Sequence, residues 1–409
     1  MIMIHMIGNR NLEIVKYFLW LITVCSLICF HGLSTYNNFN KCCKNKLVSP
    51  RFMDIKSMYL GGPNEKNDGV TFLNRRMLSI NETYKILWHY SPSYFLKKAN
   101  ISLRGCTRFN NCQLTTDLGQ MAVADVVIFR HNYLPEIPPV KQTDQIWLLY
   151  GQETPFYMRK SYLRKAWLGQ FNWSITYGDA SDISMPYASI AKEVIRAKKN
   201  YSEIYRKKTK QVAWIVSHCF AVSGRDEYVK ELRKYISVDI FGKCGNLTCA
   251  RNGTECMDKI STEYKFYLSF ENSLCKDYVS EKVFTIYSNK YSIIPVIRGA
   301  PNIDEYVPRK TYINAFDFEN PEILANYLLS LTSNEQKYSS YLQEKDKFRP
   351  YYASYYRAMC SLCEKLNKYN TSKVLENSSW FTIRNNCLVP QNRSQIVIKD
   401  KAPDYWYWD

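Results

Sequence analysis

The sequence predicts an α/β protein in which two doubly wound domains face a cleft, preceded by one N-terminal transmembrane helix and a stem. Apolar runs of four to seven residues alternate with helical stretches, a pattern typical of βαβ units and parallel sheets. The series restarts after the basic segment that ends at Lys208, which indicates a second domain. Of the 409 residues, 46% are apolar, which is enough for sizeable cores and excludes a disordered chain. Because ligands of such domains gather outside the carboxyl ends of the strands, we expect the active site in the cleft.

The individual elements follow from the apolar runs in chain order. The predicted strands are 84–88, 125–129, 146–150, 212–216, 238–241, 264–270 and 293–297. The predicted helices are 191–208, 225–236 and 281–289, and 321–366 is expected to be mostly helical. We place the first domain at 84–208, the second at 209–349, a helix with a Cys-x-x-Cys pair at 350–370 and a tail at 371–409.

The N-terminal segment predicts a membrane anchor. Residues 17–40 carry no charge, and the apolar part from Tyr17 to about Leu33 approaches the lower limit of roughly 17–25 residues for a spanning helix. No small-x-small cleavage site follows, so we favour an uncleaved signal anchor at 17–33 over a cleaved signal. Residues 1–16 would then be a cytoplasmic tail, and 34–83 a stem.

The rest of the chain indicates the oxidising secretory lumen. Twelve of the 14 Cys lie beyond the predicted span, where disulfides would form. Sequons for N-linked glycans begin at Asn81, Asn100, Asn172, Asn200, Asn246, Asn252, Asn370, Asn377 and Asn392. A span this short is compatible with sorting to a Golgi membrane, with the body of the protein in the lumen. A plasma-membrane or secreted ectodomain is the alternative.

The charge distribution points to small anions. The formal net charge is +18, from 55 Lys and Arg against 37 Asp and Glu, and it is spread along the chain. This spread argues against a nucleic-acid-binding arm and favours attraction to small anions or membrane headgroups. The five His are scattered and no Asp-x-Asp occurs, so no metal site is predicted. A diphosphate substrate would have to be neutralised by Arg, Lys and helix N-termini.

Two segments are candidates for such an anion site. Arg225 follows the strand exit 217–224 and begins a helix, which would bring a guanidinium and free backbone N–H groups together. Ser280 can cap a helix whose first turn holds Glu281 and Lys282. Each has a plainer alternative, a solvated arginine in a turn or an ordinary capped helix. Together the two segments suggest a phosphate site.

Glu153 is the candidate general base. It lies just past the predicted strand 146–150, where a carboxylate would project into the cleft and could reach the hydroxyl that it deprotonates. The alternative is a loop carboxylate at a strand end. Cys360 and Cys363 form a Cys-x-x-Cys pair without a second such pair or a nearby His, which favours two disulfide halves over a redox or zinc site.

One block of the second domain, residues 266–284, reads Phe-Tyr-Leu-Ser-Phe-Glu-Asn-Ser-Leu-Cys-Lys-Asp-Tyr-Val-Ser-Glu-Lys-Val-Phe. It is followed by Ile-Pro-Val-Ile at 294–297 and Gly-Ala-Pro-Asn at 299–302, and preceded by matching segments at 171–177 and 238–244. This set closely resembles the α1,3-fucosyltransferases, glycosyltransferase family 10. The resemblance covers roughly residues 84–366, and the Cys-rich spacing is most similar to invertebrate and plant members.

The resemblance implies a type II Golgi enzyme of two Rossmann-like domains, the GT-B arrangement. It would transfer L-fucose from GDP-fucose, with inversion, to the 3-OH of an N-acetylglucosamine in glycoprotein or glycolipid glycans. Glu153 would be the general base, Arg225 and Lys282 would bind the pyrophosphate, and Glu281 would hold ribose or fucose hydroxyls. No cofactor would be strictly required, although Mn²⁺ or Mg²⁺ could stimulate the reaction. The further residues expected around the donor or acceptor are Asn272, Tyr278, Glu271, Tyr177 and Asp182.

The resemblance also implies that Cys106 and Cys112 pair with Cys360 and Cys363 in some order, joining the C-terminal helix to the first domain. Where the family usually reads Ser-Tyr-Arg-x-Asp-Ser-Asp, this chain reads Thr-Tyr-Gly-Asp-Ala-Ser-Asp at 176–182, so an arginine and a carboxylate are missing. The segment 285–291 departs as well. These differences leave the donor residues intact and affect the acceptor range. They leave one alternative function, a non-catalytic glycan- or nucleotide-binding relative.

Overall fold

The computed structural model describes residues 72–74, 77–79, 82–92, 100–158, 160–193, 199–248, 254–369, 371–373, 386–392 and 395–399. The predicted membrane span 17–33 lies outside these residues, as do the tail 1–16 and the sequons at Asn81, Asn252, Asn370 and Asn377. Within the described residues, no helix is both long enough and apolar enough to cross a membrane.

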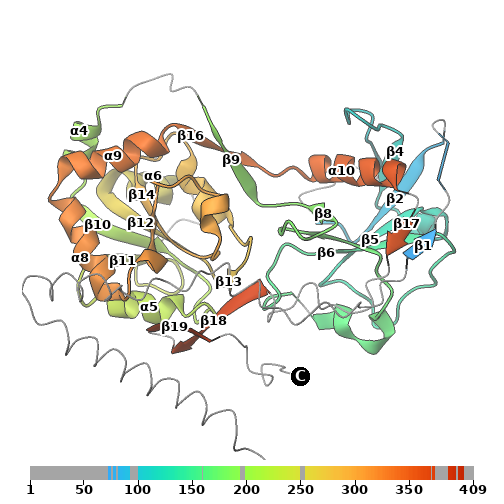
Figure 1. Cartoon of the computed structure of the whole chain (residues 1–409), viewed down its shortest axis with the longest axis horizontal. Helices are drawn as coiled ribbons and strands as arrows, with labels where there is room; N and C mark the ends of the chain where they lie inside the picture. The colour runs from blue at the N-terminus through green and yellow to red at the C-terminus, as the bar shows by residue number, and fades with distance from the viewer. Residues whose placement is uncertain are drawn as a thin grey trace, which may run out of the picture. The chain divides into compact units, whose positions relative to one another are not determined.

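The first α/β region is built on a seven-stranded sheet with the order β3-β4-β2-β5-β6-β7-β8. Figure 1 labels its strands β2, β4, β5, β6 and β8. All neighbouring pairs are parallel except β3 with β4. The central strands β5 and β6 are almost entirely buried, as expected for a parallel sheet covered on both faces. The strands are β2 (Tyr84–His89), β3 (Asn100–Ser102), β4 (Cys112–Thr115), β5 (Val126–Arg130), β6 (Ile146–Tyr150), β7 (Trp173–Thr176) and β8 (Ile183–Ser184).

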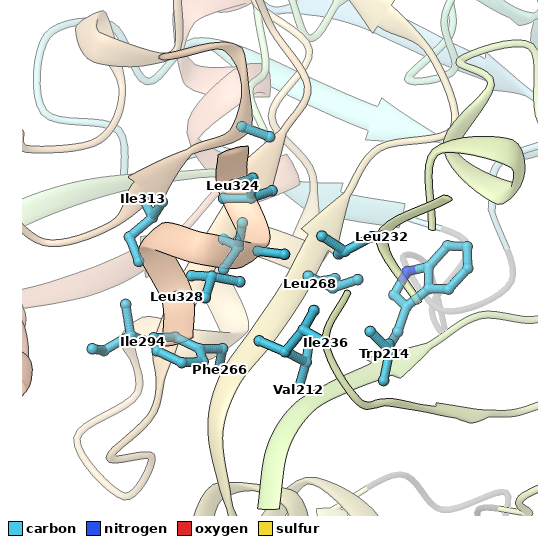
Figure 2. Close-up of a cluster of buried hydrophobic side chains, with 14 of the residues drawn as sticks. Val212, Trp214, Leu232, Ile236, Phe266, Leu268, Ile294, Ile313, Leu324 and Leu328 are labelled. Atoms are coloured by element: carbon cyan, nitrogen blue, oxygen red, sulfur yellow. The ribbon is translucent and has the colours of Figure 1, made fainter. Parts of the chain in front are cut away.

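The second region is built on a five-stranded, fully parallel sheet with the order β11-β10-β12-β14-β15. Figure 2 shows its core, where Val212, Leu268 and Ile294 of the sheet lie with Leu232 of α5 and Leu328 of α8. The strands are β10 (Lys210–Ile215), β11 (Val238–Phe241), β12 (Tyr264–Phe270), β14 (Ile294–Arg298) and β15 (Ile313–Asn314), and the helices are α5 (Arg225–Leu232), α6 (Thr254–Glu263), α8 (Pro321–Thr332) and α9 (Glu335–Lys345). The prediction of two α/β units with parallel sheets is confirmed.

The predicted helix 191–208 is wrong over its first part. Strand β9 (Ala188–Lys192) occupies this stretch and pairs antiparallel with β16 (Phe348–Tyr352), which also interrupts the expected helical stretch 321–366. The two strands form a separate ribbon (Figure 1). A helix follows at α4 (Tyr201–Lys207), and its Tyr201 is part of the core of the second region. Helix α4 therefore packs with the second sheet, although the expected boundary at Lys208 would assign it to the first.

Helix α10 (Tyr355–Lys368) follows the second region in sequence but belongs to the core of the first. Its Met359 and Leu362 are fully buried in the core beneath β2, β4 and β5. The predicted disulfides are confirmed, with Cys106 bonded to Cys360 and Cys112 to Cys363 at Cα–Cα separations of 5.4 and 6.0 Å. Cys219 is also bonded to Cys244 and Cys275 to Cys387 in the described part of the chain, and neither disulfide was predicted from the sequence.

The remaining elements are short. They are β1 (Phe72–Asn74) paired with β17 (Thr371–Lys373), the three-stranded sheet of β13 (Leu274–Cys275), β18 (Cys387–Asn392) and β19 (Gln395–Lys399), helix α7 (Glu281–Phe284), and the 3₁₀ helices η1 (Leu118–Val123), η2 (Lys160–Leu163), η3 (Lys165–Trp167), η4 (Thr285–Tyr287), η5 (Ile303–Glu305) and η6 (Ala315–Asp317).

The sequons differ in accessibility. Asn200 and Asn246 are exposed. Asn172 is only 2% exposed, and its side-chain oxygen accepts hydrogen bonds from Lys141 Nζ at 2.7 Å and from the Trp147 backbone N–H at 3.0 Å. A glycan would be attached to the amide nitrogen of this buried, hydrogen-bonded side chain and would displace packed core, so the expectation of a glycan there is corrected. Asn100 and Asn392 lie at strand ends.

Candidate active site

Glu153 lies three residues beyond the end of β6, at the carboxyl edge of the first sheet. Burial raises the pKa of its carboxyl group, and the Glu281 and Glu271 carboxylates raise it further, while the Lys282 ammonium lowers it. These three partners belong to the second region, so Glu153 faces the segment that carries the predicted phosphate-binding lysine. In the described part of the chain its carboxylate makes no hydrogen bond or ion pair of its own, which leaves it available to accept a proton.

Two hydrogen bonds, made by residues that follow Glu153, join its loop to the second region. Thr154 is fully buried, and its hydroxyl lies 2.8 Å from the Ser273 hydroxyl. The Tyr157 hydroxyl accepts a hydrogen bond of 3.3 Å from the Val222 N–H, in the loop that leads to α5. The hydrogen bonds of Thr154 and Tyr157 to the second region therefore fix the position of Glu153 relative to the second sheet.

Arg225 is the first residue of α5 and is 3% exposed, so the alternative of a solvated arginine is wrong. Its Nη1 donates to the Phe270 carbonyl at 2.8 Å and its Nη2 to the His218 carbonyl at 2.7 Å. Gly224, with φ of 64°, makes the tight entry to the helix, a conformation that glycine adopts without steric cost. A guanidinium carries five N–H donors, so donors beyond these two bonds are left for an anion.

Ser280 caps α7, as predicted. The anion bound at the start of this helix is the carboxylate of Glu271 rather than a phosphate. The Ser280 N–H and hydroxyl each donate to the Glu271 carboxylate at 2.8 Å, and Glu271 is 1% exposed. A Cβ on Gly299 would lie 2.8 Å from Glu271 Cγ, so glycine at that position is what allows the carboxylate to approach. Glu271, expected to line the pocket, instead organises the segment that carries Lys282.

Lys282 projects from α7 and is 26% exposed. Its Nζ lies 2.9 Å from Ser280 Oγ, 3.1 Å from Glu281 Oε1 and 3.3 Å from Glu271 Oε2. Burial lowers the pKa of Lys282, but the two carboxylates outweigh burial, so the pKa lies above its usual value and the ammonium stays charged. The Glu281 carboxylate is 59% exposed and is the partner that a phosphate can most easily replace.

Tyr177 and Tyr278 pack together at the contact between the two regions. Their rings meet edge to face at 4.9 Å, and Tyr187 contacts Tyr278 at 5.9 Å while donating a hydrogen bond to the Gln152 carbonyl at 3.1 Å. Burial, and then the charge of Glu153, raise the pKa of Tyr187, which places this ring beside the candidate base. These tyrosines build the wall next to Glu153.

The other two predicted site residues differ in position. The Asn272 backbone carbonyl accepts from the Ser223 N–H at 3.1 Å, and its buried side-chain oxygen has no hydrogen-bond partner in the described chain. Asp182 accepts from the Ser174 N–H and hydroxyl and pairs with Lys365 of α10. Through these contacts Asp182 joins β7 to helix α10 within the first region.

A small pocket lies where the sequence departs from the family pattern. A Cβ on Gly178 would lie 3.5 Å from Asp277 Oδ2, so the missing side chain would point at this carboxylate. Asp277 keeps a hydrogen bond of 2.8 Å from the Asn302 side chain. The pocket is lined by Thr176, Tyr177, Gly178, Ala180, Ser181, Lys276, Asp277 and Asn386.

Sequence reasoning missed Arg298, the last residue of β14. It is 2% exposed, donates from Nη1 to the Ser223 carbonyl at 2.6 Å and lies 5.0 Å from the centre of the Tyr228 ring. Burial lowers its pKa to about 10. Arg298 therefore holds the loop that precedes Arg225. The one feature of the sequence that could have indicated this role is a charged residue at the end of a buried apolar strand. Among the residues that the structure describes, no group of three or more His, Cys, Asp or Glu could hold a metal ion.

Two family models match the chain. Residues 81–188 match the model described as "Fucosyltransferase, N-terminal", and residues 205–380 match "Glycosyltransferase family 10 (fucosyltransferase) C-term". The chain belongs to glycosyltransferase family 10. Its Glu153 and its Arg225–Lys282 pair fall within the two matched segments.

Several characterised proteins are similar to this member of the family. Glycoprotein 3-alpha-L-fucosyltransferase A of Drosophila melanogaster is 34% identical over 70% of this chain, which spans 56% of that relative's length. An alpha-(1,3)-fucosyltransferase of Caenorhabditis elegans is 28% identical over 91% of this chain and 96% of that relative's length. A 3-galactosyl-N-acetylglucosaminide 4-alpha-L-fucosyltransferase of Bos taurus is 32% identical, with 66% and 74% covered. A crystal structure of an alpha1,3-fucosyltransferase with GDP-fucose is 17% identical, with a TM-score of 0.47 over 75% of this chain and 95% of that one.

Proposed function

We propose that this protein is an inverting α1,3-fucosyltransferase that transfers L-fucose from GDP-fucose to the 3-OH of an N-acetylglucosamine in a glycoprotein or glycolipid glycan. The observation that carries the proposal is the electrostatic coupling of Glu153, at the edge of the first sheet, to Lys282 and Glu281 of the second. A carboxylate without an ion-pair partner among the described residues and a charged lysine thus lie close enough to influence each other's charge, in a chain that belongs to family 10. The names of the relatives support the linkage.

The reaction needs one base and a stabilised leaving group. The acceptor 3-OH attacks the anomeric carbon of fucose while the Glu153 carboxylate takes the hydroxyl proton. The bond from the anomeric carbon to the β-phosphate oxygen breaks, and its electron pair leaves with GDP. Because attack and departure occur on opposite faces of the sugar ring in a single displacement, the anomeric configuration inverts.

The negative charge that grows on GDP is met by the protein. Lys282 supplies an ammonium that can exchange its exposed Glu281 partner for a phosphate oxygen, and Arg225 supplies further N–H donors from a buried, fixed guanidinium. Donors that are already in position cost little reorganisation as charge develops. We propose that this arrangement needs no divalent cation, although one could still stimulate turnover.

The raised pKa of Glu153 suits its proposed role. A carboxylate that is buried beside two other carboxylates binds a proton more strongly than one in water, which makes it a better base for a sugar hydroxyl. The alternative of a non-catalytic relative is not favoured, because both the base and the cations are retained.

We also propose that the protein is a single-pass type II Golgi membrane protein with its α/β regions in the lumen. The disulfides in the described chain support an oxidising compartment, since such bonds are rare in the cytosol. Expression with a tag at each end, followed by protease protection of intact vesicles, tests this. A C-terminal tag that is digested in intact vesicles would contradict it.

The activity is tested by incubating the purified full-length chain with GDP-fucose and a panel of acceptors. The panel holds N-glycan cores, N-acetyllactosamine and LacdiNAc oligosaccharides, and products are analysed for linkage, with and without a chelator. We expect fucose at the 3-OH of an N-acetylglucosamine in both conditions. Absence of fucose transfer to every acceptor would refute the proposal.

A further inference from the structure

Two exposed tyrosines stack on each other at the carboxyl edge of the first sheet. Tyr90, directly after β2, is 52% exposed, and Tyr133, three residues after β5, is 49% exposed. Their ring centres lie 5.7 Å apart with planes inclined by 21°. The Arg130 guanidinium lies 5.2 Å from the centre of the Tyr133 ring. Two aromatic rings and a guanidinium therefore form one surface that we call the Tyr90–Tyr133 platform.

The backbone holds this platform in place. Tyr90 has φ of 54°, a left-handed conformation that is rare for a bulky residue and is retained only where the surroundings determine it. The buried His89 ring packs edge to face against Tyr90 at 4.6 Å. The Tyr133 N–H donates to the Arg130 carbonyl at 2.9 Å, which fixes the turn after β5. The two rings are thus kept exposed by a strained residue and a hydrogen-bonded turn, rather than by an unstructured loop.

The platform lies on the same sheet edge as Glu153. Strands β2, β5 and β6 are adjacent and parallel, and Glu153 follows β6. Since neighbouring strands are spaced by about 4.8 Å, the strand that leads to Tyr133 is about 5 Å from the strand of Glu153, and that of Tyr90 about 10 Å. The first residue after β5 is also bonded to the end of β6, because the His131 N–H donates to the Tyr150 carbonyl at 3.0 Å.

We propose that the Tyr90–Tyr133 platform is a subsite for the acceptor glycan and binds a neutral sugar one or two residues away from the fucosylated one. This inference rests on the proposed function. A pyranose has a face of C–H groups that packs on an aromatic ring, and hydroxyls around its rim that accept hydrogen bonds from an arginine. The donor diphosphate instead requires Arg225 and Lys282, which belong to the other sheet.

Binding to the full-length protein tests the subsite separately from catalysis. Calorimetry of the GDP-loaded chain with a branched N-glycan acceptor compares wild type, Tyr133→Ala and Tyr133→Phe. We expect Tyr133→Ala to weaken binding of the oligosaccharide by about 3- to 10-fold and Tyr133→Phe to bind within about twofold of wild type, since phenylalanine keeps the ring. Tyr235→Ala removes another exposed tyrosine, beyond α5, and should change nothing.

Acceptor length supplies the second readout. With a single N-acetylglucosamine glycoside as acceptor, the KM of Tyr133→Ala should equal that of wild type, because this sugar does not reach the platform. The inference is overturned if the oligosaccharide affinity of Tyr133→Ala is unchanged, if the GDP affinity or melting temperature falls in parallel, or if wild type binds no glycan. A wild type that binds the glycan but transfers no fucose would refute the proposed function alone.

Discussion

Replacing Lys282 with Ala is expected to weaken GDP binding by about tenfold. The magnitude follows from the bonds that the ammonium already makes. Its three N–H donors are occupied by Ser280 Oγ, Glu281 Oε1 and Glu271 Oε2, so a phosphate oxygen must replace one of them. Glu281, 59% exposed, is replaced most easily, because water can solvate it once it is released.

The exchange sets the size of the effect. A charge-assisted hydrogen bond is worth about 1.5–3 kcal/mol, and the exposed ion pair that it replaces about 0–1 kcal/mol. The difference of roughly 1.5 kcal/mol corresponds to about tenfold in Kd. Had the lysine been unpaired, the upper value of about 3 kcal/mol would apply, which is more than 100-fold.

Calorimetric titration with GDP measures this effect. Lys230→Ala, which removes an exposed lysine from α5, is the matched control and should keep wild-type affinity. Melting temperatures show whether each variant is folded, which matters because Lys282→Ala also removes a partner of the buried Glu271. An unchanged GDP affinity in folded Lys282→Ala would remove Lys282 from the donor site.

Two further predictions concern pH and stability. Burial and the neighbouring carboxylates raise the pKa of Glu153 above the ordinary value of 4.5. Because a general base works only when it is deprotonated, kcat/KM should fall as the pH drops through a midpoint above 4.5. A midpoint at or below 4.5 would contradict the site geometry. For the disulfides, Cys106–Cys360 closes a loop of 254 residues, and once it is formed Cys112–Cys363 closes a ring of only about ten. Removing Cys112–Cys363 alone should cost about 3 kcal/mol and removing both about 8 kcal/mol, measured by denaturant unfolding; equal losses from the single and double removal would refute this.

The strands that the sequence predicted well are those with continuous apolar runs. The bounds of β6 match the prediction, because all five of its residues are apolar and buried, as expected for a strand covered on both faces. Strand β7 was missed because it buries Ser174, whose hydroxyl bonds with Asp182. Strand β9 was predicted as helix, since its pairing partner β16 lies about 150 residues later and local periodicity does not contain that information.

In the site, too, local motifs predicted some residues, while the roles of others depend on contacts between distant segments. The positions of Glu153 and Lys282 follow from motifs at strand and helix ends, and the structure brings them together. The role of Glu271 at the start of α7 was not predictable, because it depends on the close approach of Gly299, which directly follows β14. Asp182 belongs to the segment 176–182 that was matched to the family pattern, yet its partners are Ser174 and Lys365. The motif alone did not distinguish a supporting residue from a site residue.

The most direct test is Glu153→Gln, assayed in a single turnover with saturating GDP-fucose and acceptor in the presence of a chelator. Glutamine has nearly the same shape but cannot take the proton, so the transfer rate should fall by about 10²–10⁴-fold while the Kd for GDP stays within about twofold of wild type. A variant that transfers fucose at the wild-type rate, or a wild type that is inactive until a divalent cation is restored, would contradict a mechanism in which this carboxylate and the protein's own cations perform the reaction.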